Sequence, residues 1–282
     1  FVFDKTRDTF RRELYPDYKG TRSRTPEPLK QQFVLMERIL EEAGFKVLYS
    51  GRYEADDYAG SLVHKFREQV PVVVMTKDHD YLQLVDDGHN VRAWMVQSKQ
   101  EKADELYDKY YAPYGMDKRS VNLPEKTFEF TAGHVLAEEG VWPHQITDLK
   151  GIQGDTSDNI PGVKGVASAA PILLGEYGTI EEIYAAIHEA EKDKASLKEL
   201  QDFWKSGLGI SRSPYKALTK TGEEDELCGE AAALLSKQLA TIKTDIAIEE
   251  TLDDFHVSGY DEDKLKAWCR KLDIKEESVF GK

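Results

Sequence analysis

The sequence contains only two cysteines, Cys228 and Cys269, among its 282 residues. Two thiols so far apart in the sequence exclude a disulfide framework and a thiolate metal site. No apolar run approaches the roughly 18 residues that span a membrane, and no charged-then-apolar leader opens the chain. We therefore expect a cytoplasmic protein without a membrane partner.

The sequence also lacks the excess of positive charge that most nucleic-acid-binding proteins carry. Its 38 lysines and arginines are outnumbered by 52 acidic residues, which gives a formal net charge of -14. Basic residues nevertheless crowd the first thirty positions, and carboxylates that bind metal ions lose much of their net charge when the ions are bound. The net charge therefore does not exclude DNA as a partner.

The first half of the sequence alternates between short apolar runs and helical patterns. Strands are expected at 45–49, 71–75 and 91–96, with residues 1–4 as the end of another strand. Helices are expected at 28–43, 54–66, 81–85, 131–139, 143–153, from 179, 229–239 and 261–272. The pattern predicts an α/β fold with a mostly parallel central sheet flanked by helices. We place a boundary between an α/β core at 1–153 and a mainly helical part at 154–282.

Acidic side chains directly follow several of the expected strands, where α/β folds gather their functional groups. They are Asp4, Glu54, Asp56, Asp57, Asp78 and Asp80. One acidic pair alone would be an ordinary solvated surface, but several pairs at strand or helix ends favour a metal site. Because no histidine or cysteine group has metal-ligand spacing, the oxygen ligands predict two Mg²⁺ ions, which Mn²⁺ can replace. Two such ions about 4 Å apart promote attack of water on a phosphodiester.

Residues 154–165 combine a pair of aspartates with a glycine-rich turn. Asp155 and Asp158, three residues apart, can point at a common cation from one side of a helical turn. The turn that follows, Gly162-Val163-Lys164-Gly165, leaves backbone N–H groups unshielded, so that they and the lysine can hold a phosphate. The alternative for either half alone is a helix cap followed by an ordinary Gly-Pro loop.

Residues 5–28 mix lysines and arginines with aromatic residues and three prolines, without a sustained period. This composition is typical of a surface segment that grips a nucleic-acid strand. A solvated loop with a few anchoring aromatics is the alternative.

Four motifs occur in a characteristic order: Phe3-Asp4 with the run from Phe10 to Arg22, Tyr53 to Asp57, Thr76 to Leu84, and Gly154 to Val163. Together they resemble the 5′-nuclease domain of bacterial DNA polymerase I, which belongs to the flap endonuclease family. The resemblance covers residues 1 to about 180 and continues more weakly to the end. It implies a core of the PIN and flap-endonuclease type, followed by a helix-hairpin-helix.

The resemblance implies a structure-specific 5′ nuclease that removes 5′ flaps and RNA primers from branched or nicked duplex DNA, with two divalent metals. Residues 5–28 then match the helical arch, with Lys19 and Arg22 at the scissile region. The implied metal ligands are Asp4, Glu54, Asp56, Asp57, Asp78, Asp80, Asp155 and Asp158. The implied DNA contacts are Arg11, Tyr15, Lys19, Arg22, Gly162, Val163, Lys164 and Gly165. A nucleoid-associated protein is expected, with a polymerase domain as a candidate further part of the parent chain.

The sequence departs from the family in three places. The family's first strand, with a further metal-binding aspartate, precedes the part that matches residue 1. The family continues Gly-x-Lys-Thr-Ala after the hairpin, where this sequence has Ala167-Ser168-Ala169-Ala170-Pro171, and residues 98–126 are longer than usual. The alternative function is therefore a catalytically impaired fragment that binds branched DNA. An RNase with a related α/β core is a third hypothesis, which the basic segment and the hairpin disfavour.

Overall fold

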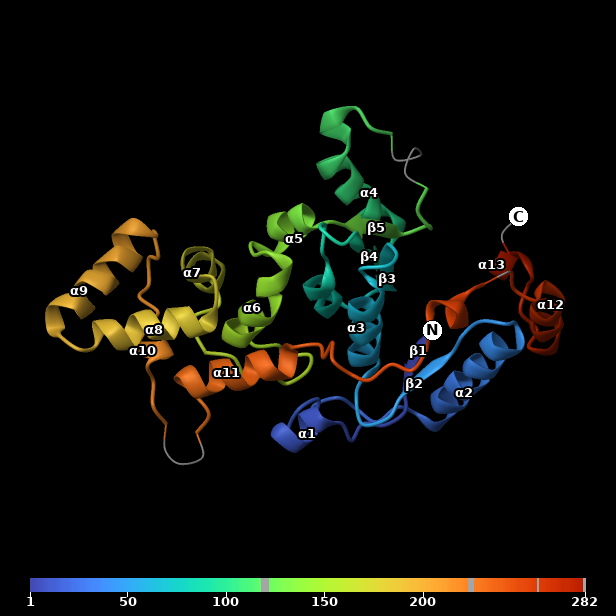
Figure 1. Ribbon diagram of the computed structural model, residues 1–282, viewed down its shortest axis with the longest axis horizontal. Coiled ribbons are helices and arrows are strands. Elements are labelled where there is room, and N and C mark those ends of the chain that lie inside the picture. The colour runs from blue at the N-terminus through green and yellow to red at the C-terminus, as the bar shows by residue number, and fades with distance from the viewer. Residues whose placement is uncertain (118–121, 223–225, 258, 281–282) are drawn as a thin grey trace.

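The computed structural model describes residues 1–117, 122–222, 226–257 and 259–280. No helix within these ranges is both long and apolar enough to cross a membrane. The molecule is elongated in Figure 1, with the helices α8 (Ile180–Ala190) and α9 (Lys194–Asp202) at one end and α2 (Glu27–Glu42) and α12 (Glu262–Lys271) at the other. The strands lie between these ends.

The strands form two small sheets instead of the single central sheet that the sequence predicts. β1 (Val2–Asp4) pairs in parallel with β2 (Leu48–Ser50), and β3 (Val72–Thr76) pairs in parallel with β4 (Val91–Val96). β5 (Thr127–Phe130), which the sequence analysis missed, adds to β4 in the antiparallel sense. No pairing joins the two sheets among the described residues. The α/β class is confirmed, and α3 (Ala55–Phe66) contacts strands of both sheets.

The other helices of the first half frame these sheets. They are α1 (Phe10–Leu14), the 3-10 helix η1 (His79–Leu84), α4 (Gln100–Tyr110), η2 (Ala112–Tyr114), α5 (Ala132–Glu139) and η4 (Pro143–Gln145). Within the long stretch 98–126, the sequence allows a helix at 101–111, and α4 is found there. α4 packs on β5, where Tyr107 meets Phe128 with ring centroids 5.3 Å apart.

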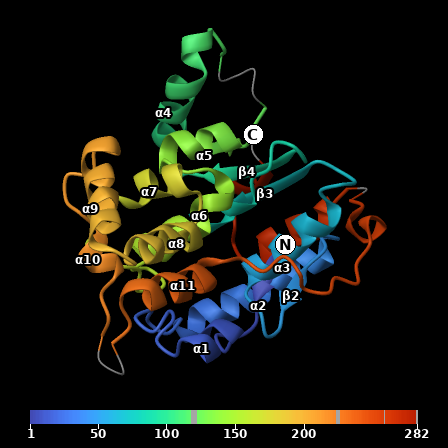
Figure 2. The same ribbon diagram turned by 60° about the vertical axis from the view of Figure 1, so that its left-hand side comes forward.

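The second half is helical, as expected. Its remaining elements are α6 (Ile146–Gln153), α7 (Ala170–Tyr177), the π-helix η5 (Phe203–Gly207), α10 (Tyr215–Leu218), α11 (Gly229–Ala240), η6 (Leu252–Phe255) and α13 (Glu277–Phe280). Figure 2 shows α6, α8 and α11 next to one another. The main core combines residues from both sides of position 153, such as Leu82, Phe128, Ile183 and Trp204. The boundary at 153 therefore stays a prediction.

Residues 241–250, the C-terminal strap, run along α3. Lys65 Nζ donates to the carbonyls of Ile248 and Glu250 at 2.7 and 2.8 Å, and the Ile246 amide donates to Ser61 Oγ at 3.1 Å. Gly60 allows this close approach, because a Cβ there would lie 2.4 Å from Ile242 Cγ2. The strap therefore fixes α3, whose first turn carries three of the acidic residues predicted to bind metal.

Candidate active site

The first turn of α3 directs its acidic residues in different directions. Glu54 is the N-cap, and its amide donates to Asp57 Oδ2 at 2.9 Å in a capping box. Carboxylates are favourable here because the helix dipole places partial positive charge at its N-terminus. Asp4 at the end of β1 joins this turn, since its Oδ1 accepts from the Ala55 amide at 2.6 Å. Two segments about fifty residues apart are thereby brought together.

Asp57 is fully buried and paired with Arg11, which is only 1% exposed. The Arg11 guanidinium donates to both carboxylate oxygens at 2.6 and 2.7 Å, and also to the carbonyls of Leu239 and Thr241. Burial alone would lower the pKa of Arg11, but the hydrogen bonds and charge of Asp57 raise it. This pair joins α1, α3 and the end of α11. The prediction that Arg11 contacts DNA is corrected, because the guanidinium is buried and its donors are used inside the fold.

Glu54 and Asp158, the first acid group, are bridged by side chains from residues 18–22. Lys19 Nζ lies 2.7 Å from Glu54 and 3.5 Å from Asp158, and Arg22 forms an ion pair with Asp158. The buried Tyr18 hydroxyl lies 3.2 Å from both carboxylates. Burial would lower the pKa of Lys19, but the charge of Glu54 raises it. The predicted pair Lys19 and Arg22 is thus brought to the acids.

Asp80 and Asp155, the second acid group, are bridged by Lys150 of α6. Its Nζ lies 2.8 Å from Asp155 Oδ2 and forms an ion pair with Asp80. Ser157 donates to Asp155 from its amide and its hydroxyl at 2.8 and 2.7 Å. Burial would raise the pKa of Asp155, but the Lys150 and Ser157 hydrogen bonds lower it to about 2. Asp78, which is exposed, caps η1 by accepting from the Asp80 amide at 2.9 Å.

Asp56 remains without a hydrogen bond or ion pair to the other described residues. Burial and the neighbouring charge of Glu54 raise its pKa to about 7. This is the behaviour of a carboxylate in a region with surplus negative charge. A hard divalent cation fits such a donor set, because all the side chains offer oxygen. Yet no three histidine, cysteine or acidic side chains of the described residues are arranged to hold one ion, and lysines and arginines occupy the space between the carboxylates instead.

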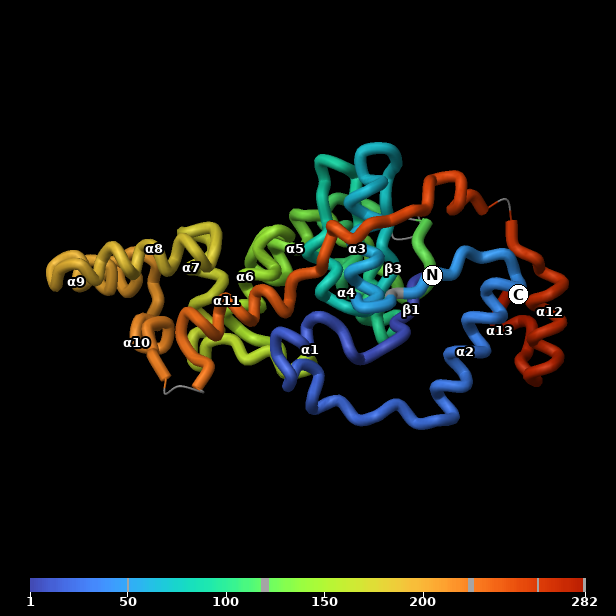
Figure 3. Tube along the Cα trace, turned by 60° about the horizontal axis from the view of Figure 1, so that its bottom comes forward, coloured from blue at the N-terminus to red at the C-terminus, as the bar shows by residue number. Residues whose placement is uncertain are grey.

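A cavity of about 750 Å³ opens beside the first acid group. Figure 3 shows the chain from α1 to α2 bowing away from β1 and α3 on this side. Three carboxylates line the cavity, those of Asp4, Glu54 and Glu37, the last of which pairs with Lys5. Six basic side chains line it as well; they are Lys5, Arg7, Arg12, Lys19, Arg22 and Lys30. Phe33 and Val34 of α2 supply apolar surface. Because basic side chains outnumber the carboxylates of the lining, the cavity can accept an anionic ligand beside Glu54.

The turn at 162–165 is only half available to a ligand. The Gly162 amide donates to Ser236 Oγ at 2.9 Å, and the amide of the buried Val163 donates to the Ile152 carbonyl at 2.7 Å. The predicted DNA contacts at these two positions are corrected for that reason. Lys164 and Gly165 are exposed, whereas Tyr15 is half-buried against the cluster around Tyr18 and Ile160.

Sequence reasoning missed two residues of this site, Lys150 and Tyr18. Lys150 lies five positions before Asp155 on an ordinary helical stretch, and its second partner, Asp80, is seventy positions away. Tyr18 was noted only as one of several aromatic residues among basic ones. Because a bridging role depends on partners distant in sequence, no local pattern pointed to either residue.

Comparisons with known proteins agree with the fold. Residues 1–111 match the family described as 5′-3′ exonuclease, N-terminal resolvase-like domain, and residues 141–208 match the 5′-3′ exonuclease, C-terminal SAM fold. The chain belongs to the 5′-3′ exonuclease family. Its two matched regions contain both acid groups and the segment with Lys19 and Arg22.

Relatives of this 5′-3′ exonuclease family chain include DNA polymerase I of Caldicellulosiruptor bescii, 31% identical over 97% of the chain, and of Chloroflexus aurantiacus, 32% identical over 97%. The chain spans about a quarter of their length, 26% and 24%.

Similar solved structures include the T5 D15 protein co-crystallised with metal ions. Its TM-score is 0.53 at 21% identity, over 98% of this chain and 85% of that one. A mutant of the T5 5′-exonuclease has a TM-score of 0.51 at 20% identity, covering 96% and 82%. At these identities the structures support the fold.

Proposed function

We propose that the chain is a Mg²⁺-dependent 5′ nuclease that hydrolyses phosphodiester bonds in branched or nicked duplex DNA with a 5′ flap, and in RNA primers. The observation that carries the proposal is the meeting of acidic side chains from β1, α3, η1 and residues 155–158 beside a cavity lined with basic side chains. Family membership supports the reaction class. The polymerase I relatives support a parent chain that also contains a polymerase and acts at the nucleoid.

The cations would be held by the two acid groups, Glu54 with Asp158 and Asp80 with Asp155, together with Asp4, Asp56 and Asp78. Two bound Mg²⁺ or Mn²⁺ ions would supply an activated water and stabilise the leaving oxygen. In the present arrangement Lys19 and Arg22 neutralise Glu54 and Asp158. Once cations take over that role, these two side chains are free to contact the phosphate next to the scissile bond, which makes Lys19 and Arg22 the proposed catalytic side chains.

The helix-hairpin-helix is proposed for α6, residues 154–169 and α7. Lys164 and the Gly165 amide are its exposed groups and would contact the duplex backbone. Asp57 would support the metal site indirectly, since both of its oxygens accept hydrogen bonds from Arg11.

Cleavage of a labelled 5′-flap duplex with and without Mg²⁺ tests the proposal. We expect Mg²⁺-dependent release of the flap, and a loss of at least about a hundredfold in Asp78→Ala and Asp155→Ala, with binding of the duplex retained. Asp202→Ala, an exposed acid of α9, serves as the matched control and should cleave like the unaltered chain. Equal cleavage by all variants would refute the assignment.

The alternative, a DNA-structure-binding fragment without catalysis, is favoured by one observation. Among the described residues the two acid groups, Glu54 with Asp158 and Asp80 with Asp155, are each bridged by a lysine, and no three acids form a metal group. In that case the flap duplex would bind in EDTA and in Mg²⁺ alike, and no product would appear in either. The same assay therefore separates the two functions.

A further inference from the structure

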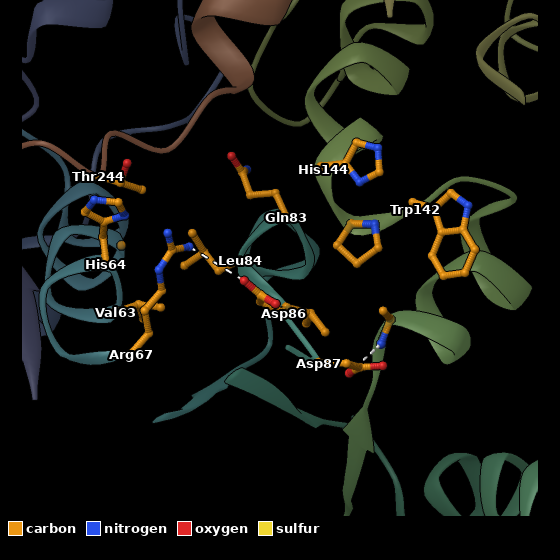
Figure 4. Close-up of a pocket in the computed structure, with 14 residues that line it drawn as sticks. Val63, His64, Arg67, Gln83, Leu84, Asp86, Asp87, Trp142, His144 and Thr244 are labelled. Atoms are coloured by element: carbon orange, nitrogen blue, oxygen red, sulfur yellow. Dashed lines mark hydrogen bonds and ion pairs between the residues drawn. The ribbon is translucent and has the colours of Figure 1, made fainter. Parts of the chain in front are cut away.

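A second cavity, of about 420 Å³, lies between α3, η1 and η4, away from both acid groups. Figure 4 shows His64 and Arg67 of α3 on one side and Trp142 and His144 on the other, with the end of η1 between them. His64 follows Asp57 by seven residues on α3, which corresponds to about 10 Å along the helix axis. The volume lies within the ~300–1,000 Å³ of small-ligand sites.

Three donor side chains of this cavity, those of Arg67, His64 and His144, have no hydrogen-bond acceptor among the described residues, whereas Gln83 donates to the Ala240 carbonyl. The Arg67 guanidinium, with a side chain 31% exposed, donates no hydrogen bond to a described residue, and its nearest anionic group is Asp86 Oδ2 at 3.7 Å. Its Nε is the one buried side-chain nitrogen or oxygen of the described residues without a partner. The rings of His64 and His144 likewise contact no described polar partner. Both histidine rings are exposed to solvent, whereas Arg67 Nε is buried. Since buried donors are normally satisfied, the unpaired Arg67 Nε indicates a missing acceptor at this cavity.

The carboxylates of the cavity, in contrast, already have hydrogen-bond or ion-pair partners among the described residues. Asp86 Oδ2 lies 2.6 Å from His89 Nδ1, and Asp86 Oδ1 accepts from the Gly88 amide at 3.0 Å. Asp87 Oδ1 lies 2.8 Å from Arg92 and accepts from the Ala132 amide at 3.2 Å. The groups of the cavity that remain available are therefore hydrogen-bond donors, and they suit an anion with several oxygen acceptors, such as a phosphate.

Trp142 adds an aromatic face at the rim of this cavity. Its side chain is 44% exposed, which is unusual for so large an apolar group and leaves the indole ring available for stacking. Planar bases stack on such rings without requiring a particular sequence. A ligand that combines a phosphate with a planar base satisfies both walls of the cavity at once.

We propose that this cavity binds a nucleotide, with its phosphate at Arg67, His64 and His144 and its base on Trp142. The proposal is independent of the metal-dependent nuclease function, because none of these residues belongs to either acid group. The nucleotide is either a free 5′-mononucleotide or one residue of a DNA strand that passes over this face; both present the same phosphate and base.

Calorimetric titration of the whole chain in EDTA with dTMP, thymidine and inorganic phosphate tests the proposal. EDTA removes divalent ions that would recruit phosphate to the acid groups. We expect dTMP to bind at least about tenfold more tightly than thymidine or phosphate, because only dTMP engages both walls. Arg67→Gln should reduce dTMP affinity to that of thymidine, and Trp142→Ala should reduce it to that of phosphate.

Two variants with the same changes elsewhere are the controls. Arg38→Gln removes an exposed arginine of α2. Phe203→Ala removes an aromatic ring at the start of η5, where the residue is 41% exposed. Both should bind dTMP like the unaltered chain, and thermal unfolding verifies that all four variants fold. Equal losses in control and cavity variants, or unchanged dTMP binding in both cavity variants, overturn the proposal.

A 5′-phosphorylated thymidine oligonucleotide distinguishes the two sources of the nucleotide. Binding of dTMP that depends on Arg67 and Trp142 identifies a mononucleotide site. The other result is that dTMP does not bind, while both cavity variants, but neither control variant, bind the oligonucleotide at least about fivefold more weakly. In that case the cavity holds one residue of a strand. Absence of both effects refutes the site.

Discussion

At the scale of single residues, neighbouring carboxylates have different roles. Asp56 and Asp57 are adjacent in the sequence, and both are predicted as metal ligands. Asp57 is fully buried and held by two hydrogen bonds from Arg11, whereas burial and Glu54 raise the pKa of Asp56 to about 7. The sequence identified the acidic cluster because it follows a strand, but the direction of each side chain depends on its position in the first helical turn.

Arg11→Met is predicted to lower the free energy of unfolding by about 3–5 kcal/mol, because it leaves the Asp57 carboxylate buried without its partner. Denaturant unfolding at neutral pH measures the change. Arg12→Met, at the half-buried neighbouring position, is the control and should change stability by less than about 1 kcal/mol. A similar small loss in both variants would show that the Arg11 pair does not hold α1 to α3.

Asp56→Asn is predicted to stabilise the metal-free chain at pH 8 and to have little effect at pH 4. The raised pKa of Asp56 favours the protonated form in the folded state, so its favourable contribution is complete below about pH 4 and is lost as pH rises through about 7. We expect a gain of about 1–3 kcal/mol at pH 8. Denaturant unfolding at both pH values in EDTA provides the measurement, and a gain of equal size at both would contradict the assignment.

At the scale of secondary-structure elements, the sequence predicted longer helices such as α2, α3 and α11, and four of the five strands found among the described residues. It missed short helices such as α1 and α10. The strand expected at 91–96 is found as β4 with the same bounds, because its residues alternate clearly between buried and half-buried positions. β5 was missed because Thr127–Phe130 follows a stretch without a clear period. The continuous apolar run at 71–75 is typical of a strand buried on both faces, yet Val73 and Met75 are 44% and 54% exposed. A continuous apolar run does not determine which other elements will pack against it.

Gly162→Ala is predicted to destabilise the turn that holds Asp155 and Asp158 in place. Gly162 has φ of 59°, and a Cβ there would lie 2.3 Å from the Gly154 nitrogen, a backbone atom that cannot move away freely. We expect a loss of about 3 kcal/mol or more in denaturant unfolding.

Gly165→Ala is the matched control for that change. Its φ of 88° is also in the left-handed region, but no described atom lies within 4 Å of the added Cβ. It should therefore lose only about 1 kcal/mol. Equal losses at the two positions would mean that backbone conformation, and not close approach to Gly154, determines the effect.

At the scale of the whole molecule, segments far apart in the sequence meet at one place. Arg11 bonds Thr241 across 230 positions, and Lys150 joins Asp80 to Asp155. The sequence predicted the convergence of the acids from the rule that strand ends gather functional groups. It did not predict that cationic side chains separate the acids into two groups, because that outcome depends on packing between α6, α11 and the first thirty residues.

Counting bound Mn²⁺ ions by titration, with electron paramagnetic resonance to measure free Mn²⁺, tests most directly whether these acids hold divalent cations. The unaltered chain should bind two ions at a site that Mg²⁺ competes for. Asp155→Ala should lose at least one of them, and Asp202→Ala should keep both. A chain that binds no Mn²⁺ up to millimolar concentration, or binds it equally in both variants, would contradict the account.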